Sequence, residues 1–180
     1  MEYYDVISNS YDELYREEQL NKLSAVKNSI KISKKVKILD VGCGTGISSD
    51  FNCFVVGIDP SIRLLNQNKN DKKLLSVAEV LPFKDASFDY VVSITSIHNF
   101  NNIKKSINEI KRVGRENFVF SVLKNSKRFG YIKRLIGANY KIGDVIEEEK
   151  DIIFFCQKSK IFDHARKSLC DLPTCKNHKS

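Results

Sequence analysis

Long apolar runs and export signals are both missing from this sequence. No apolar segment of the 180 residues approaches the roughly 20 that a membrane-spanning helix needs. The N-terminal stretch MEYYDVISNSYDELYREEQ has neither the basic start nor the apolar centre of a signal peptide. The cysteines are odd in number and scattered, which favours reduced thiols over a disulfide framework: Cys43, Cys53, Cys156, Cys170 and Cys175. We therefore expect a cytoplasmic protein without a membrane span.

A metal centre is not expected either. Cys170, Cys175 and His178 form a short cluster, but no fourth ligand follows at a spacing typical of zinc sites. No cysteine occupies a position that suggests a catalytic nucleophile.

Acidic residues are scarce in one part of the chain. The formal net charge is +8, and between residues 104 and 141 the only acids are Glu109 and Glu116, among many lysines and arginines. This asymmetry is compatible with an anionic partner such as RNA, and equally with a solvated surface.

Internal repeats are absent, and strand-like and helix-like segments alternate instead. The segments typical of strands are 36–41, 54–59, 73–77, 87–95 and 117–123, and those typical of helices are 10–32, 61–68, 102–113 and 126–137. Residues 140–146 and 151–157 flank a turn and suggest a hairpin. The pattern predicts an α/β fold, a Rossmann-like doubly wound, mostly parallel seven-stranded sheet with a C-terminal antiparallel hairpin.

A glycine-rich loop follows the first of these strands. Gly42, Gly44 and Gly46 permit a sharp turn and let the backbone approach a ligand closely. If a helix begins after the loop, free backbone amides are also expected there. The spacing is not that of a phosphate-binding P-loop, and the third glycine comes one residue early for GxGxxG. Asp59 ends the second strand, where one carboxylate can accept both hydroxyls of a ribose.

Four segments carry a family resemblance. ILDVGCGTG, VVGIDPS, AEVLPFKDASFDYVVS and SINEIKRV resemble, in order, the motifs of class I S-adenosylmethionine-dependent methyltransferases, most closely the branch of ubiquinone and menaquinone biosynthesis. The resemblance implies S-adenosyl-L-methionine as cofactor and S-adenosyl-L-homocysteine as product. It also implies one domain over residues 1–157, whose N-terminal helical segment 1–34 covers the cofactor, and a basic extension over 158–180.

The resemblance further implies a role for individual residues. Asp40 would hold the methionine amino group, and Asp59 the ribose hydroxyls. His98 would face the methyl group as a catalytic residue, or would be only a satisfied polar residue at a strand–helix junction. The residues implied to bind the cofactor are Tyr11, Asp40, Gly42, Cys43, Gly44, Asp59, Pro60, Ala78, Glu79, Ser93 and Ile94.

The chain departs from the family pattern at several points. Val77 stands where many relatives have an aspartate for the adenine amino group, so the adenine would be held by backbone alone. GREN, residues 114–117, replaces the usual KPGG before the fifth strand. The helix after the glycine loop has room for only about two turns.

The methyl acceptor stays open at this stage. Enzymes that methylate adenine amino groups or glutamine amides carry an asparagine-proline-proline-tyrosine signature after the fourth strand. This chain has SITSIHNF there instead, which argues against that chemistry. A small-molecule acceptor is favoured, with a small activating protein as a further partner class. The alternatives are RNA or the translation apparatus, or a cofactor-binding protein without activity. An RNA face would be built from Lys124, Lys127, Arg128, Lys133 and Arg134, while Phe129, Ile132 and Leu135 pack inward.

Overall fold

The computed structural model describes the backbone of residues 2–159 and the side chains of residues 16–159. The strands are β1 (Lys37–Val41), β2 (Phe54–Asp59), β3 (Lys73–Leu75), β4 (Phe88–Ile94), β5 (Gly114–Leu123), β6 (Tyr140–Glu147) and β7 (Asp151–Lys158). The helices are α1 (Glu2–Ser29), α2 (Ile62–Gln67), α3 (Ile103–Val113) and α4 (Phe129–Asn139), with short 3₁₀ helices η1 (Ile47–Ser49) and η2 (Ile97–Asn99).

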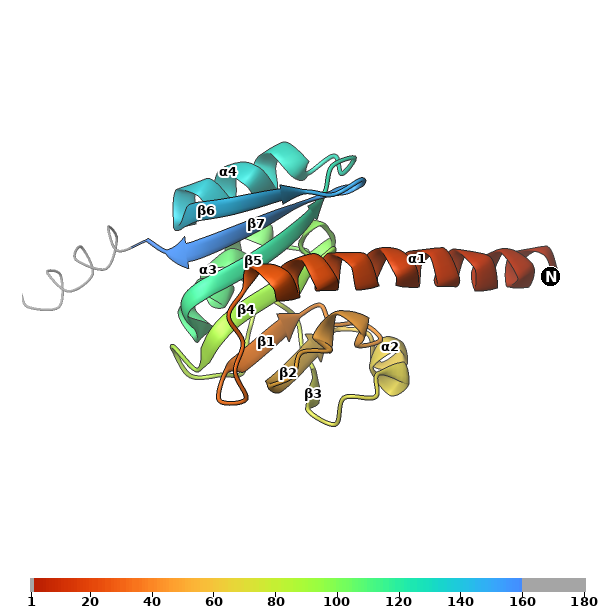
Figure 1. The fold of residues 1–180 in the computed structure, drawn as a ribbon, viewed down its shortest axis with the longest axis horizontal. Coiled ribbons are helices and arrows are strands. Elements are labelled where there is room, and N and C mark those ends of the chain that lie inside the picture. Colours follow the sequence, from red (N-terminus) through yellow and green to blue (C-terminus); the bar gives the residue numbers. More distant parts are fainter. Residues whose placement is uncertain (1, 160–180) are drawn as a thin grey trace, which may run out of the picture.

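The strands form one seven-stranded sheet in the order β3-β2-β1-β4-β5-β7-β6 (Figure 1). Strands β1 to β5 are parallel to one another, and β7 pairs antiparallel with both β5 and β6. The chain order reverses between β1 and β4, so the carboxyl ends of these strands frame the place where such sheets bind ligands. The fold class expected from the sequence is confirmed, including the C-terminal hairpin.

Helices cover both faces of the sheet (Figure 1). On one face, α3 and α4 bury Ile107, Ile110 and Ile132 against the strands. On the other face, α1 packs Leu23 and Val26 against residues of β1, β2, β4, β5 and β7. Burial on both faces explains why the strands read as continuous apolar runs.

Capping side chains set the start of two helices close to the expected positions. The Ser61 hydroxyl accepts from the amide of Leu64, and the Asn102 side chain accepts from the amide of Lys105. Each side chain thereby satisfies an amide that has no partner inside its helix.

Three elements differ from the expectation. A single 3₁₀ turn, η1, replaces the helix expected after the glycine loop, and α1 begins at Glu2 rather than at residue 10. Strand β5 already begins at Gly114, because GREN pairs with the start of β4. Within residues 2–159, no helix is long and apolar enough to cross a membrane.

Candidate cofactor and active site

The glycine-rich loop leaves β1 with left-handed backbone at Gly42, Gly44 and Gly46, whose φ values are 81°, 51° and 87°. A Cβ added at Gly42 would lie 2.5 Å from the Cβ of Ser96, so no larger residue fits there. A Cβ at Gly44 would meet only Leu64, at 3.8 Å. The loop therefore needs its glycines for backbone conformation and, at Gly42, for space.

The backbone amides of this loop are largely occupied, which corrects the expectation of free donors. Gly42 and Cys43 both donate to the carbonyl of Ile58, at 2.8 and 2.9 Å. The amide of Gly44 donates to the carboxylate of Asp59, at 3.0 Å. Because η1 is only one turn, the loop folds back on β2 instead of opening onto a helix N-terminus.

Asp59 lies at the carboxyl end of β2 and is 7% exposed. Its Oδ2 accepts from the amide of Gly44, and its Oδ1 accepts from the amide of Ser61 at 2.8 Å. Each carboxylate oxygen can accept a second hydrogen bond, so ribose hydroxyls still find acceptors here.

Asp40 lies in β1 and is fully buried. Its Oδ2 accepts from the hydroxyls of Ser48 and Ser49, at 2.8 and 2.6 Å, while its Oδ1 has no hydrogen-bond partner. Burial raises the pKa of this carboxyl from 3.8 to about 6, against the lowering effect of the two serines. A buried oxygen without a donor is costly, so a cationic or N–H-bearing ligand group would be stabilised beside it.

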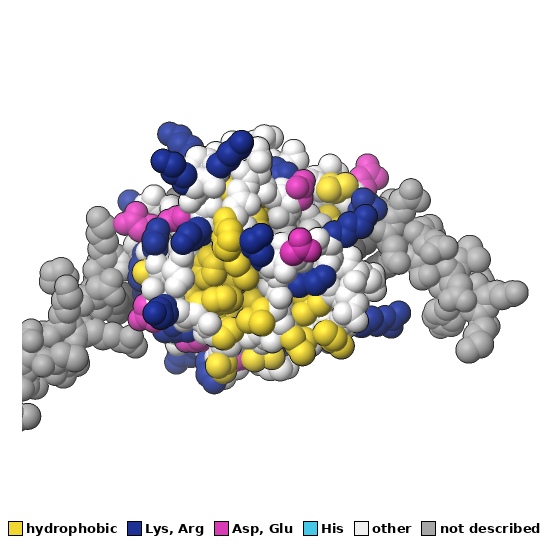
Figure 2. All heavy atoms as spheres, turned by 90° about the horizontal axis from the view of Figure 1, so that it is seen from below, with side chains coloured by type: hydrophobic (Ala, Val, Ile, Leu, Met, Phe, Trp, Pro, Cys, Tyr) yellow, Lys and Arg dark blue, Asp and Glu magenta, His cyan; other side chains and the backbone are white. Residues whose placement is uncertain are grey.

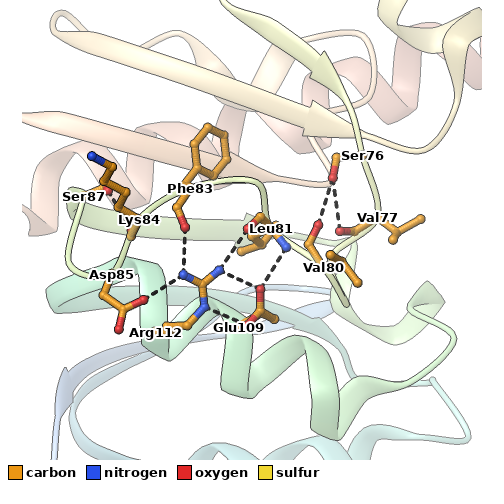
Figure 3. Close-up of polar contacts among 10 residues, drawn as sticks. All are labelled: Ser76, Val77, Val80, Leu81, Phe83, Lys84, Asp85, Ser87, Glu109 and Arg112. Atoms are coloured by element: carbon orange, nitrogen blue, oxygen red, sulfur yellow. Dashed lines mark hydrogen bonds and ion pairs between the residues drawn. The ribbon is translucent and has the colours of Figure 1, made fainter.

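The loop that follows the segment expected to meet the adenine is fixed from below by Arg112 of α3 (Figure 3). The guanidinium donates to the carbonyls of Leu81 and Phe83, at 2.9 and 2.7 Å, and to the carboxylates of Asp85 and Glu109. Glu109 in turn accepts from the amide of Leu81, at 2.9 Å. The loop over residues 81–85 is thereby clamped to α3.

Ala78 and Glu79 precede this clamped loop. Ala78 is buried, and the carboxylate of Glu79 accepts from the amide of Asn102 at 2.8 Å. The Glu79 side chain thus has a structural partner, which leaves the backbone of this segment as the part that faces a ligand. Pro60 and Val77 are exposed close to the ends of β2 and β3.

The carboxyl end of β4 carries Ser93 and Ile94, both buried. The hydroxyls of Ser93 and Ser96 lie 2.7 Å apart, and Ser96 donates to the carbonyl of Val41 at 2.8 Å. This link joins the ends of β4 and β1 directly beneath Gly42. It holds together the two strands between which the chain order reverses.

His98 lies half-buried in η2, just beyond β4, and its Nδ1 has no partner. Burial lowers the pKa of the imidazole, and the nearby Asp151 carboxylate opposes that shift. A neutral imidazole with an unpartnered nitrogen can accept a proton from a substrate.

Tyr11 and Cys43 are two further residues that the family resemblance implies in cofactor binding. The side chain of Tyr11 is outside the described residues, as are Cys170, Cys175 and His178. The Cys43 thiol is buried, and burial raises its pKa to about 12, so it is no nucleophile at neutral pH.

Sequence reasoning missed Lys22, Thr95 and Asp151. Lys22 of α1 forms a buried ion pair with Asp151, at the start of β7, and donates to the hydroxyl of Thr95 at 3.0 Å. No sequence motif includes residues so far apart in the chain. The one signal that could have indicated them is a lysine at a buried position of an amphipathic helix.

A cavity of about 1020 Å³ opens on the outer side of the glycine loop. It is lined by parts of α1, η1 and α2, including Arg16, Thr45 and Asn68. Asp40, Asp59 and His98 are not part of its lining. Gly46, Ser49 and Ser61 do line it, so the cavity adjoins the glycine loop and the residues that bond to Asp40 and Asp59.

The residues at the ends of β1, β2 and β4 fit S-adenosylmethionine. Asp40 offers an unpartnered buried oxygen for the amino group, and Asp59 offers acceptors for the ribose. Gly44 leaves space for the close approach of a ligand, and the loop over residues 81–85 is held in place by Arg112.

Comparison with known proteins gives a consistent result. The methyltransferase domain family matches residues 39–121. An uncharacterized protein of Methanocaldococcus jannaschii, MJ1252, is 34% identical in an alignment of 149 residues that covers 78% of this chain and 58% of that protein. The ubiquinone biosynthesis O-methyltransferase of Pelagibacter ubique is 28% identical, over 86% of this chain and 69% of the relative.

Among solved structures, a Haloferax volcanii methyltransferase in complex with the Trm112 methyltransferase activator superposes with a TM-score of 0.68. The identity is 13%, over 84% of this chain and 95% of that chain, so the similarity is one of fold. The chain spans 58% and 48% of the lengths of the two Methanocaldococcus jannaschii relatives MJ1252 and MJ0638, about half of each. Its glycine loop, its acidic strand ends, its strand order and its matches place the chain in the class I S-adenosylmethionine-dependent methyltransferases.

Proposed function

We propose that this chain binds S-adenosyl-L-methionine and transfers its methyl group to a small-molecule acceptor. The observation that carries the proposal is the unpartnered buried Oδ1 of Asp40, beside a loop of left-handed glycines and across from Asp59. When bound, the cofactor supplies a methyl group on a positively charged sulfur, which leaves as a neutral thioether.

The residues of the chain then have distinct tasks. Asp40 holds the amino group, Asp59 holds the ribose, and the backbone at residues 78–79 meets the adenine. His98, neutral at physiological pH, accepts a proton from an acceptor that arrives protonated. Alignment of the acceptor and exclusion of water supply most of the remaining rate enhancement.

Calorimetric titration with S-adenosylhomocysteine tests the proposal directly. Binding is expected to raise the melting temperature by mass action, and the Asp59→Ala variant is expected to lose most of that shift. No heat and no thermal shift at millimolar ligand would remove the cofactor assignment.

RNA as acceptor is the second candidate, and one observation favours it. Lys127, in the turn before α4, and Lys133 and Arg134, on α4, are exposed. On the same helix Ile132 is buried, and Phe129 and Leu135 pack against the core. The expected inward and outward faces of this helix are confirmed. A cofactor-binding protein without activity is the remaining alternative, for which methyl transfer itself is the test.

A small activating protein is proposed as partner at the edge of the sheet. Strand β3 is an edge strand, and large hydrophobic side chains around it are exposed: Leu74, Leu75, Val77 and Val80. Figure 2 looks at this side of the molecule, where hydrophobic side chains form a continuous area. Exposed edges of this kind are normally protected in isolated proteins.

Co-expression with a Trm112-type activator tests this partner class. We expect a stable complex, which Leu75→Asp should disrupt. A chain that remains monomeric and unbound in this experiment contradicts the proposal. The cytoplasm is the proposed location, supported by the free thiols of Cys43, Cys53 and Cys156.

A further inference from the structure

Three side chains from distant parts of the chain meet at the carboxyl end of β4. We call Lys22, Thr95 and Asp151 the Thr95 cluster. The ammonium of Lys22 pairs with Oδ2 of Asp151 and donates to the hydroxyl of Thr95 at 3.0 Å. The Thr95 hydroxyl also donates to Oδ2 of Asp151, at 3.3 Å. Lys22 is 1% exposed and Asp151 is 0% exposed.

One oxygen of the cluster has no partner. All of the described contacts reach Oδ2 of Asp151, whereas Oδ1 is buried and unsatisfied. A buried carboxylate oxygen without a donor is costly, and an ion pair that served only to fasten α1 would be expected to satisfy both oxygens. The orientation of Asp151 therefore leaves an acceptor for a group that the chain does not supply.

The backbone of Thr95 gives an independent indication of function. Its φ is 52°, in the left-handed region, which a β-branched residue rarely adopts. Such strain persists where the surrounding structure enforces it, and it is concentrated at functional sites. Here it turns the Thr95 hydroxyl toward Lys22 and Asp151, and Gln19 of α1 donates to the same hydroxyl at 3.4 Å.

The cluster lies beside the strands that carry the proposed cofactor-binding residues. Asp40 and Asp59 hold the cofactor on β1 and β2, whereas the cluster lies at the end of β4 and the start of β7. Asp151 is close enough to His98 to influence its pKa. The cluster and the proposed proton acceptor therefore lie near each other.

We propose that Asp151 binds the methyl acceptor, by accepting a hydrogen bond from a hydroxyl group of that acceptor through Oδ1. Lys22 and Thr95 are positioning residues that hold the carboxylate in this orientation. This inference rests on the proposed function and names the substrate class of the same site.

Charge and surroundings decide between a hydroxyl and a cationic amine. Lys22 pairs with both Asp151 and Glu18, and Glu18 also pairs with Lys150. Two ammonium groups thus balance two carboxylates, so the cluster does not attract a cation strongly. Ile94, at the end of β4, and Ile153, near the start of β7, are buried in the apolar cluster that also contains Leu23 of α1. A neutral hydroxyl on an apolar body therefore fits best. Asp151 is fully buried beside Lys22 of α1, so the proposed contact requires this part of α1 to shift.

Phenol and anisole are suitable probes, because they share an apolar ring and only phenol donates a hydrogen bond. Binding to the full chain would be measured by saturation-transfer NMR, with and without S-adenosylhomocysteine. We expect phenol to bind at least fivefold more tightly than anisole, and benzylammonium to bind no better than anisole. Calorimetry with S-adenosylhomocysteine alone reports separately on the proposed function.

The double variant Lys22→Met/Asp151→Leu removes the cluster without leaving an unpaired buried charge, a replacement that proteins often tolerate. We expect it to lose the preference for phenol while it binds S-adenosylhomocysteine like the wild type. Asp151→Asn, which keeps an acceptor oxygen, should retain part of the preference. The control variant Lys27→Met/Asp50→Asn removes an exposed ion pair that also ties α1 to the domain, and it should keep the full preference.

Several outcomes would overturn the inference. They are equal binding of phenol and anisole to the wild type, no detectable binding of either probe at millimolar concentration, and a preference for phenol that survives in Lys22→Met/Asp151→Leu. A preference that is lost equally in the Lys27→Met/Asp50→Asn control would assign the effect to the attachment of α1 rather than to Asp151.

Discussion

The amide of Gly44 donates to the carboxylate of Asp59 at 3.0 Å, which ties the glycine-rich loop to the end of β2. The same carboxylate accepts from the amide of Ser61, so one side chain connects the loop after β1 with the start of α2. The residue proposed to bind the ribose therefore also fixes the loop that surrounds the methionine part of the cofactor. Cofactor binding and loop order are expected to depend on each other here.

Asp59→Ala should weaken both functions together. It removes two charge-assisted acceptors, and we expect a loss of about 2–3 kcal/mol in S-adenosylhomocysteine binding, roughly 30- to 150-fold in affinity. Hydrogen exchange at residues 42–46 should increase in the same variant. Asp71→Ala, at an exposed aspartate before β3, serves as the control. Wild-type affinity in Asp59→Ala would mean that the cofactor lies elsewhere.

Gly42 and Gly44 should differ in their tolerance of a methyl group. Gly42→Ala brings a Cβ within 2.5 Å of Ser96, so we expect a loss of about 2–4 kcal/mol in the free energy of unfolding, from overpacking and left-handed backbone together. Gly44→Ala has only the backbone cost, about 1 kcal/mol. Urea unfolding measures both. Gly42→Ala/Ser96→Gly should be more stable than the sum of the single changes predicts, and strict additivity would contradict the steric explanation.

The sequence predicted the sheet and the acidic strand ends correctly, because both depend on local patterns. The apolar runs and the glycines after Val41 fix where β1 ends, and thus where Asp40 and Asp59 lie. The helix after the loop was predicted wrongly. There the hydroxyls of Ser48 and Ser49 bond to Asp40, a tertiary contact that competes with helix formation.

The Thr95 cluster shows the other limit of sequence reasoning. Lys22 reads as a polar residue of an amphipathic helix, and Asp151 reads as part of a turn. Only the antiparallel return of β7 beside β5 brings Asp151 to the carboxyl end of β4. Long-range pairing of this kind leaves no periodic signal in the chain.

Asp40 should make the stability of the protein depend on pH. Its pKa is about 6 in the folded chain against 3.8 for the free group. Between these values the folded state binds more protons than the unfolded state, so the free energy of unfolding falls as pH rises from about 4 to about 7. The difference of about two units between these two pKa values corresponds to a change of about 3 kcal/mol in the free energy of unfolding. Relative to the wild type, Asp40→Asn should therefore gain stability across this range.

Cofactor binding should show the opposite trend at the same residue. The charged form of Asp40 holds the amino group, so the wild-type affinity for S-adenosylhomocysteine should fall as pH is lowered through about 6. Asp40→Asn should bind weakly, with no pH dependence in this range. Parallel pH profiles for the two proteins, in calorimetry and in urea unfolding, would exclude Asp40 from both roles.

Arg112 should be necessary for an ordered adenine end of the site. Arg112→Lys loses the planar fork that reaches Leu81, Phe83, Asp85 and Glu109, and lysine cannot replace these contacts (Figure 3). We expect a loss of about 2 kcal/mol in stability, faster hydrogen exchange at residues 81–87 and a several-fold lower affinity for S-adenosylhomocysteine. Arg115→Lys, at an exposed pair with Asp89, should cost less than about 1 kcal/mol. Equal effects of the two changes would contradict the clamp.

The basic side of α4 decides between the two acceptor classes. Lys127, Lys133 and Arg134 are exposed, whereas Arg128 donates to the carbonyls of His98 and Phe100 and is left unchanged because it supports η2. If this side binds RNA, affinity for total cellular RNA should fall with salt, with a log–log slope of about −2 for three phosphate contacts.

Replacement of the three residues by glutamate should abolish this binding and leave S-adenosylhomocysteine binding unchanged. The control variant carries glutamate at Lys31, Lys34 and Lys35, which are exposed in the segment just before β1. RNA binding that is absent at low salt, insensitive to salt or lost equally in the control would remove RNA as an acceptor and leave the small molecule.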